Sequence, residues 1–334
     1  MRKTIFFVLA ALSLVGCQHR GSSLQKVHLQ GKAQGSYYSI IYYDSLARDF
    51  QPQIDSLLTA FDNSVSLWVD SSMLRRLNAN QIVGVDETIR TLFDFASMLC
   101  QFSDSAFDCR IGKLVRAWGF GFDKREDMTD RKIDSLLQYC RQPITLDSMG
   151  NLHKHPETEI DFNAIAQGLC SDMVGAFLQA QGIDRYLVDI GGEIITKGTK
   201  PDGNAWSVGV ERPAKDSLSV QEAEIFIHLT DLSIVTSGNY RKYYEKDGVR
   251  YSHTINPRTG KPVEHSLLSA SVIAPTALQA DGMATAFMVM GLEKSVAFIE
   301  NHPDTFIKGA FFIYDDKGVM KTYATPEFKK LIEK

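Results

Sequence analysis

The residues best suited to chemistry lie in the segment YSHTINPRTGKPV, which begins at Tyr251. Two prolines restrict its backbone and Gly260 permits a turn, so we expect a fixed loop. The loop carries His253, whose side-chain type transfers protons near neutral pH. It also carries Arg258, whose fork of donors suits a phosphate. The loop is therefore predicted to supply a base to a site that handles phosphate, although a lone His is more often a surface or core residue.

A second chemical pair follows on a predicted helix, TALQADGMATAFMVMG, which starts after Pro275 and ends at Gly291. Asp281 and Thr285 are four residues apart and share one helical face. Together they offer a carboxylate and a hydroxyl, the oxygen ligands that Mg²⁺ accepts while it keeps positions open for phosphate. A solvated face or a helix cap is the simpler interpretation of such a pair.

The N-terminus has the pattern of an export signal. Arg2 and Lys3 precede an apolar run over residues 5–15 that is short for a membrane span. The run ends in Leu-Val-Gly before Cys17, which resembles a bacterial lipobox, so we expect cleavage before Cys17 and lipidation of its thiol. An uncleaved anchor or a chance cysteine is the alternative. The predicted organisation is a signal peptide at 1–16, a polar tether at 17–25 and one domain at 26–334, held at the membrane of a bacterial cell envelope and facing the periplasm or the exterior.

Composition limits the class of protein. The chain has 334 residues, of which 44% are hydrophobic and 23% charged, which is typical of a globular protein. Its formal charge of -4 provides no basic surface for nucleic acid, which we exclude as a partner. The cysteines after the signal lack C-x-x-C spacing, so zinc and thioredoxin-type chemistry are poorly supported. Disulfides and isolated buried thiols both remain as interpretations of these four, which are Cys100, Cys109, Cys140 and Cys170.

The elements that must position these residues predict an α+β fold. Apolar residues at helical spacing predict helices at 51–61, 71–77, 86–102, 129–140 and 326–332, and one that follows Asn163 and ends at Gly182. Aromatic and β-branched runs predict a strand at 35–43, a hairpin turning at 149–151, the strand YLVDIGGEI, and a β-rich region after Trp206 with a turn at 246–248. Strand and helix clusters show no regular βαβ rhythm, which favours α+β over a doubly wound sheet.

Three further segments are candidates for ligand contact. The glycine- and aromatic-rich run SAFDCRIGKLVRAWGFG is either a ligand loop or a packed connection. Asp161 and the turn from Ala164 to Gly168 open a helix, and the amides at a helix N-terminus favour an anion such as phosphate. Gly191 and Gly192 lack a Cβ, so they either let backbone approach a ligand or form a tight bend.

These segments together resemble one family. In order, the sequence shows QGSYYSI, LWVDSSMLRRLN, AFDCRIGKLVRAWGFG, IDFNAIAQG, LVDIGGEI, VTSGNYRKYY, HTINPRTGKPV and ADGMATAFMVMG. This pattern strongly resembles the ApbE family of exported flavin transferases, and the resemblance runs from about Gly31 to the C-terminus. It implies two lobes with mixed and antiparallel sheets flanked by helices, FAD between the lobes, and Mg²⁺ at the pyrophosphate of FAD.

The resemblance also implies roles for individual residues. Mg²⁺ would be held by Asp281 and Thr285, with main-chain oxygens from Ala164 and Ala284. The FAD contacts of the family fall on Gln34, Trp68, Ala106, Phe107, Asp108, Asp161, Gln167 and Ile255. Gln34 stands where the family usually has Met, and Gln167 stands where its A-K-G motif has Lys. Because Gln is neutral, we expect FAD affinity or rate to differ from the family pattern.

The activity implied is transfer of FMN from FAD to a Thr or Ser hydroxyl of an exported or membrane protein, with release of AMP. A hydroxyl is a poor nucleophile, and a base, here assigned to His253, contributes about 10²- to 10⁴-fold. The family's acceptors, such as subunits of membrane redox pumps, carry D-x-x-[ST]-G-A-[ST]. This sequence lacks the motif, so it is expected to modify other proteins. Two alternatives stay open: a Mg²⁺-dependent FAD pyrophosphatase and a non-catalytic FAD-binding lipoprotein.

Overall fold

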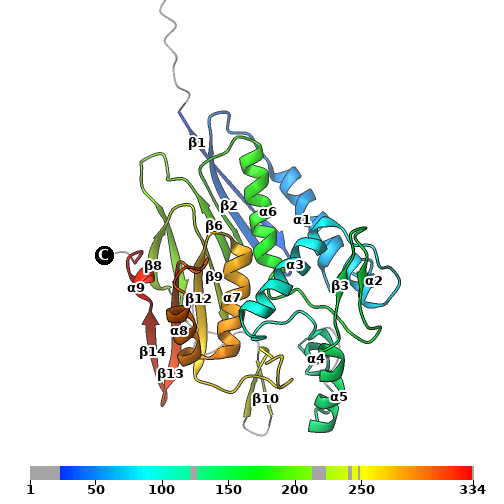
Figure 1. Ribbon diagram of the computed structural model, residues 1–334. Helices are drawn as coiled ribbons and strands as arrows, with labels where there is room; N and C mark the ends of the chain where they lie inside the picture. The colour runs from blue at the N-terminus through cyan, green and yellow to red at the C-terminus, as the bar shows by residue number, and fades with distance from the viewer. Residues whose placement is uncertain (1–22, 121–125, 213–222, 240–242, 247–248, 333–334) are drawn as a thin grey trace, which may run out of the picture.

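The computed structural model describes residues 23–120, 126–212, 223–239, 243–246 and 249–332 (Figure 1). The predicted signal peptide, Cys17 and the centre of the predicted turn at 246–248 lie outside the described residues. Side chains of the strands at 243–246 and 249–252 are likewise not described.

The described helices lie mainly in the first half and near the end of the chain. They are α1 (Gln51–Val65), α2 (Met73–Asn78), α3 (Glu87–Phe102), α4 (Gly112–Ala117), α5 (Asp130–Cys140), α6 (Ala166–Ala180), α7 (Ala277–Met290), α8 (Leu292–Asn301) and α9 (Pro326–Lys329). The strands are β1 (Gln25–Ala33), β2 (Ser36–Asp44), β3 (Thr145–Leu146), β4 (Leu152–His153), β5 (Tyr186–Ile190), β6 (Glu193–Lys197), β7 (Trp206–Glu211), β8 (Ala223–Leu229), β9 (Ser233–Gly238), β10 (Tyr243–Lys246), β11 (Val249–Ser252), β12 (Leu267–Ala274), β13 (Gly309–Asp316) and β14 (Val319–Ala324).

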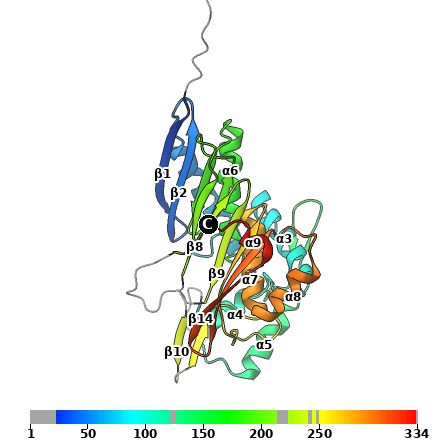
Figure 2. The same ribbon diagram turned by 90° about the vertical axis from the view of Figure 1, so that its left-hand side faces the viewer.

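One large sheet organises the molecule. It has eight strands in the order β1-β2-β5-β6-β9-β12-β13-β14. Every neighbouring pair in this sheet is antiparallel. Most of the helices lie on one side of the sheet, as the edge-on view in Figure 2 shows for α6, α7 and α8. The α+β class predicted from the sequence is therefore confirmed.

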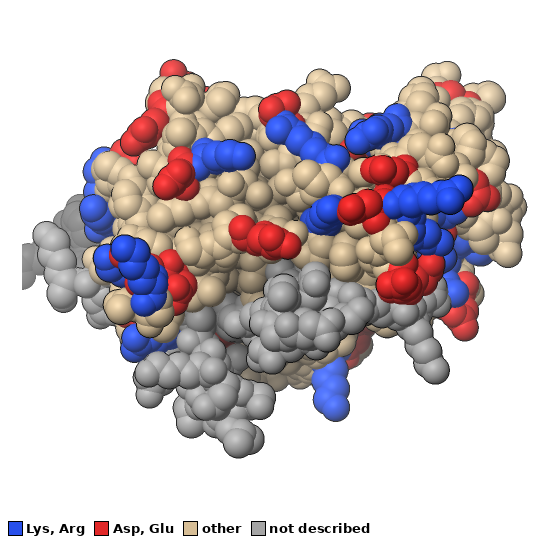
Figure 3. Space-filling model, turned by 90° about the horizontal axis from the view of Figure 1, so that it is seen from below, with Lys and Arg blue, Asp and Glu red and all other residues tan. Residues whose placement is uncertain are grey.

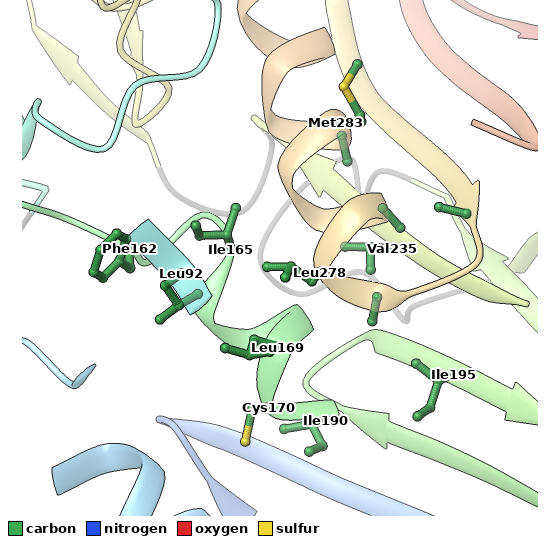
Figure 4. Close-up of a cluster of buried hydrophobic side chains, with 14 of the residues drawn as sticks. Leu92, Phe162, Ile165, Leu169, Cys170, Ile190, Ile195, Val235, Leu278 and Met283 are labelled. Carbon is green, nitrogen blue, oxygen red and sulfur yellow. The ribbon is translucent and has the colours of Figure 1, made fainter. Parts of the chain in front are cut away.

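The main core lies between this helical layer and the sheet. In β12 and β13, residues such as Val272 and Phe312 face this core, whereas Ile273 and Phe311 face a second apolar cluster. The alternation follows from the two-residue period of a strand with both faces covered. Figure 4 shows side chains of α6, such as Leu169 and Cys170, and of α7, such as Leu278 and Met283, that belong to this core. The first core therefore fixes α6 and α7, the two helices that carry the predicted cation ligands.

A smaller apolar cluster supports the loop that carries His253. It contains residues of α4 and α5 together with Trp118 and Ile255. In Figure 1 these helices lie beside the β10 hairpin at one end of the molecule. The segment SAFDCRIGKLVRAWGFG therefore includes a short packed helix, α4, which the sequence pattern did not predict as a helix.

Several helices begin at the capping residues that the sequence predicted. Thr276 caps α7, because its hydroxyl accepts from Gln279 N, and Gly291 ends the helix with φ +80°. The elements β1, α4 and α8 were not predicted, and the predicted strand YLVDIGGEI is divided between two antiparallel strands, β5 and β6. The last helix, α9, ends at Lys329, three residues before the predicted Ile332. The strand β1 begins at Gln25, the last residue of the predicted tether.

The remaining expectations concern cysteines and membrane spans. Cys100, Cys109, Cys140 and Cys170 are free thiols, and all except Cys100 are buried. Burial raises the pKa of each thiol, which keeps it protonated and unreactive. None of the described helices combines the length and the apolar character needed to cross a lipid bilayer.

Candidate active site

The closest approach between α6 and α7 brings together two of the predicted site segments. Gly168 N donates to Asp281 Oδ2 at 3.1 Å. A Cβ at Gly168 would lie 2.6 Å from Ala277 O and 2.9 Å from Asp281 Cβ, so only glycine fits there without movement. The A-x-G sequence at the start of α6 is therefore required by the packing of α7 as well as by any ligand.

Gly168 N belongs to the first turn of α6, whose amides have no acceptor inside the helix. Asp281 therefore caps this end of α6 from the neighbouring helix. Ala164 lies two residues before α6 and is half-buried, and no described hydrogen bond reaches its carbonyl oxygen. This oxygen is therefore a candidate ligand close in sequence to the contact between Gly168 and Asp281.

On α7, Thr285 is half-buried while its neighbours in the helix are buried. Its hydroxyl lies 3.3 Å from Ser237 Oγ at the end of β9. Ala284 is fully buried and has no polar side-chain atom. Its carbonyl lies inside the helix, where carbonyls accept from the amide four residues later, so it is the least suitable of the four predicted metal ligands.

Asp281 is a buried carboxylate, and only 5% of its surface is exposed. Burial raises its pKa well above the ordinary range, the Gly168 N–H lowers it, and the charge of Asp172 raises it again. In the described part of the chain no Lys, Arg or His forms an ion pair with Asp281. A cation would supply the missing positive charge.

The donor set fits a hard cation such as Mg²⁺. Asp281 keeps one carboxylate oxygen free of Gly168, Thr285 offers a hydroxyl, and Ala164 offers its carbonyl. Among the described residues no three His, Cys, Asp or Glu side chains converge on one point. A cation site here therefore depends on a single carboxylate and neutral oxygens, a set that leaves room for oxygens of a phosphate.

Asp161 contacts the backbone of Cys109, the residue directly after the predicted segment at 106–108. Asp161 N donates to Cys109 O at 2.8 Å, and Asp161 Oδ1 accepts from Asn163 N at 2.7 Å. Burial raises the pKa of Asp161, and the bond from Asn163 lowers it. The side chain of Asp108 is held by Arg110, with Arg110 Nη2 2.6 Å from Asp108 Oδ2.

The side chains of this segment are therefore engaged within the protein. Ala106 and Phe107 are buried in the main core, as Ile255 is in the smaller cluster. These residues would contact FAD through main-chain atoms or through a small part of the side chain. The segment is therefore a packed connection, one of the two interpretations that its sequence allowed.

The loop that begins at Tyr251 is fixed, as predicted. Asn256 N donates to Lys261 O at 2.9 Å and Gly260 N donates to Asn256 O at 2.8 Å. Trp118 Nε1 donates to Gly260 O at 2.8 Å, which ties the loop to the end of α4. The His253 ring meets the ring of Phe120 edge-on, with centroids 6.3 Å apart.

Arg258 pairs with Asp104, whereas the sequence suggested that its guanidinium would contact a phosphate. Its guanidinium contacts both the backbone oxygen and the carboxylate of Asp104. Asp104 and Ser105 both have positive φ, at 50° and 58°. These residues come directly before Ala106, so Arg258 connects the His253 loop to the segment at 106–108 instead of pointing a free fork at a phosphate.

A cavity of about 250 Å³ adjoins Asp161. It is lined by Trp68 and Asp161 together with charged side chains that include Arg75, Arg76 and Arg116. The side chain of Trp68 is accessible, since 63% of the residue is exposed. The structure thus places two predicted FAD contacts on one cavity.

Charge on the surface is mixed. On the face shown in Figure 3, Lys and Arg side chains alternate with Asp and Glu, and no large area carries one sign.

The two departures from the family pattern lie near the ends of β2 and β5. Gln167 is so close to Gly191 that a Cβ on Gly191 would lie 2.1 Å from Gln167 Nε2. Gly191 and Gly192 have φ +68° and +109° and form the turn between β5 and β6, which is the tight bend considered above. Gln34 has φ +53° in the turn after β1, and its side chain lies near the buried thiol of Cys170, whose pKa it lowers by hydrogen bonding while burial raises it.

Hydrogen bonds and ion pairs therefore join the predicted site segments in a chain. Asp281 contacts the start of α6, and Asp161, which precedes this start, contacts Cys109. Arg258 connects the His253 loop to Asp104, so the segment at 106–108 is held at both of its ends. Sequence reasoning missed Asp172, whose carboxylate accepts from the first amides of α7. The available signal was an acidic residue in an otherwise largely apolar helix.

The chain is similar to one family of known proteins. The sequence model of the ApbE family matches residues 34–307. The FAD:protein FMN transferase of Vibrio cholerae is 36% identical over 344 aligned residues that cover 100% of both chains, and that of Salmonella typhimurium is 32% identical, covering 97% of this chain and 95% of its own length. The solved structure of flavin transferase ApbE from Vibrio cholerae superposes with a TM-score of 0.80 at 35% identity, covering 92% of this chain and 99% of that one. The chain belongs to the ApbE family.

Proposed function

We propose that this chain transfers FMN from FAD to a Thr or Ser hydroxyl of an acceptor protein, in a reaction that depends on Mg²⁺ and releases AMP. The observation that carries the proposal is the buried carboxylate of Asp281, which contacts the start of α6 and pairs with no described cationic side chain, in a member of the ApbE family. The relatives named FAD:protein FMN transferase cover the chain almost completely, which supports the same reaction here.

Asp281, Thr285 and Ala164 O would hold the Mg²⁺. Bound there, the ion would neutralise charge on the pyrophosphate of FAD. Asp281 supplies the only charge in this set, while Thr285 and Ala164 supply neutral oxygens. Gly168 holds one Asp281 oxygen by its N–H, which fixes the orientation of the carboxylate.

FAD would bind along the chain of contacts described above. The accessible indole of Trp68 offers a flat apolar surface to an aromatic ring of FAD. Gln167 and the buried amide of Gln34 would donate hydrogen bonds, and main-chain atoms of Ala106, Phe107, Asp108 and Ile255 would complete the site. Gln167 lacks the charge of the family Lys, so it would stabilise phosphate less than a Lys does.

His253 would act as the base. The acceptor hydroxyl attacks the phosphorus on the riboflavin side, a new phosphorus–oxygen bond forms, and the bond to the bridging oxygen breaks as AMP leaves. The proton of the hydroxyl goes to His253, whose loop is fixed by Trp118. A fixed base raises the rate because it is already placed when substrates arrive.

We also propose that the protein is an envelope lipoprotein. The lipobox-like sequence at Cys17 supports removal of residues 1–16 and attachment to the membrane through lipid, facing the periplasm or the exterior. Its acceptors would carry D-x-x-[ST]-G-A-[ST] and include membrane redox-pump subunits.

The test is incubation of the purified protein with FAD, Mg²⁺ and a fusion protein that carries a D-x-x-T-G-A-T peptide. We expect fluorescent flavin on the fusion protein in a denaturing gel, and one AMP for each flavin attached. A fusion with Ala in place of the acceptor Thr should remain unlabelled. Free FMN without labelling would show a pyrophosphatase instead, and unchanged FAD would show a binding protein.

A further inference from the structure

We infer that Asp172 is a positioning residue for the cation site and acts through the N-terminus of α7. This inference rests on the proposed function, because it concerns the Mg²⁺ site assigned above. Asp172 lies in α6, and its two carboxylate oxygens accept from Ala277 N at 2.8 Å and from Leu278 N at 2.9 Å. These are the first two amides of α7, which have no partner inside the helix.

The contact forms one half of a reciprocal connection between the two helices. Asp172 of α6 holds the start of α7, and Asp281 of α7 accepts from Gly168 of α6. Gly168 and Asp172 are four residues apart, as are Ala277 and Asp281. Each pair spans about one turn of its helix, so the two connections fix both the separation and the register of α6 and α7. The register therefore sets how the Asp281 carboxylate lies relative to the start of α6.

Asp172 also changes the electrostatic potential at the site. A helix N-terminus carries roughly half a positive charge, which would oppose a cation bound one turn away. The carboxylate of Asp172 accepts from the amides that carry this charge and adds a negative charge of its own. No described Lys, Arg or His side chain pairs with it. Its net effect therefore favours a cation at Asp281.

A neutral cap would stabilise the helix end without changing the charge near Asp281, and α7 has such a cap in Thr276. Thr276 caps the same helix through its hydroxyl, which accepts from Gln279 N at 3.3 Å. Thr276 is neutral and lies on α7 itself, so its removal weakens the helix end without changing the charge or the connection to α6. Thr276→Ala is thus the matched control for Asp172→Asn.

The experiment measures binding of Mn²⁺ alone, as a probe for Mg²⁺, by electron paramagnetic resonance on the full chain without FAD. Outer residues that support metal ligands typically change affinity by about 10- to 100-fold. We expect Asp172→Asn to weaken Mn²⁺ binding at least about tenfold, Thr276→Ala to bind as the wild type does, and Asp281→Ala to lose the site. Circular dichroism checks that each variant is folded. If Asp172→Asn is not folded, Asp172→Ser replaces it, because the shorter hydroxyl still accepts one N–H and carries no charge.

The outcomes separate this inference from the proposed function. Wild-type affinity in folded Asp172→Asn, with binding lost in Asp281→Ala, would overturn the role of Asp172 alone. Equal weakening in Asp172→Asn and Thr276→Ala would also overturn it, because any cap would then suffice. Wild-type affinity in Asp281→Ala would overturn the cation site itself, and with it both the proposed function's metal and this inference.

Discussion

At the scale of single residues, the candidate site separates two tasks. Asp281 is enclosed and accepts from Gly168 N, which fixes the direction of its carboxylate and suits it to hold a cation. His253 is half-buried on a loop that other residues hold in place, which suits it to exchange a proton with a substrate that enters from solvent. Loss of His253 should therefore affect the rate of flavin transfer, whereas loss of Asp281 should affect cation binding and the pH dependence of stability.

Replacing His253 by Ala should slow flavin transfer at least about a hundredfold while FAD still binds, because a lost base affects the transition state more than the ground state. Gel fluorescence of the labelled acceptor measures the rate, and a fluorescence titration measures FAD affinity. Trp118→Phe is the control, since it keeps the ring but removes the donor to Gly260 O. If loosening the loop were the whole effect, both variants would lose affinity and rate together. Labelling by His253→Ala at the wild-type rate would show that another group is the base.

Asp281 should make stability depend on pH in the metal-free protein. Burial raises its folded-state pKa above the unfolded value, so the folded protein binds more protons. The free energy of unfolding should therefore fall as pH rises above about 4 toward neutral, by about 1.4 kcal/mol for each unit of pKa shift. Burial raises the pKa of Asp172 as well, which adds to the same trend.

Urea unfolding at pH 5 and pH 7.5 measures this trend. Asp281→Asn should show a smaller loss than the wild type, because its amide still accepts from Gly168 but does not ionise. Saturating Mg²⁺ should reduce the loss in the wild type, because it stabilises the ionised carboxylate. Parallel losses in both proteins, with or without Mg²⁺, would place the titrating group elsewhere.

At the scale of elements, the contact between α6 and α7 sets the geometry of the cation site. The sequence contains the parts of this contact, since Asp281 and Thr285 at helical spacing predict one face of α7. The contact between that face and the start of α6 is part of the tertiary structure, and no local sequence pattern indicates it. It depends on Gly168, which nothing in the sequence distinguishes from the other glycines. In the structure, a side chain at this position would collide with Ala277 O and keep the two helices apart.

Gly168→Ala should therefore separate the helices. The added Cβ would meet Ala277 O at 2.6 Å, and a backbone atom has no rotamer by which to move away. We expect a loss of about 1–3 kcal/mol in the free energy of unfolding, together with a large fall in transfer rate, measured by urea unfolding and gel fluorescence.

Gly175→Ala, in the same helix, is the matched control. Its added Cβ would meet the ends of the Ile195 and Tyr186 side chains, which can shift. It should lower stability and leave the transfer rate near the wild-type value. The interpretation fails if the two variants lose activity equally.

The limits of the sequence-based predictions have the same physical origin. Capping residues and period predicted most helix positions, because those signals are local. Strand β1 was missed because polar residues alternate along an edge strand and its pairing with β2 is what orders it. Arg258 was predicted to meet phosphate because its chemistry allows it, but its partner, Asp104, is 154 residues away in sequence and is chosen by the fold.

At the scale of the whole molecule, the described sheet begins after the predicted export signal. The first described strand begins at Gln25, eight positions after Cys17, and pairs with β2 along its whole length. All the proposed site residues follow that strand or its turn. Membrane attachment and catalysis should be separable by changes in the N-terminal segment.

We expect the wild-type protein, expressed in a bacterium and labelled with a palmitate analogue, to appear in the membrane fraction with label on Cys17. Three acyl chains hold a protein stably, whereas one chain binds only weakly. Mass spectrometry should find the chain starting at Cys17. Cys17→Ala should carry no label and retain residues 1–16, because the lipidated cysteine directs cleavage. Cys100→Ala, which changes the least buried of the four other thiols, should be labelled normally.

A chain that starts at residue 23 should be soluble and should flavinylate the acceptor fusion at the wild-type rate, because all the proposed site residues follow that point. Unlabelled wild-type protein would refute the anchor, and an inactive but folded truncated chain would show that the N-terminal segment takes part in the reaction.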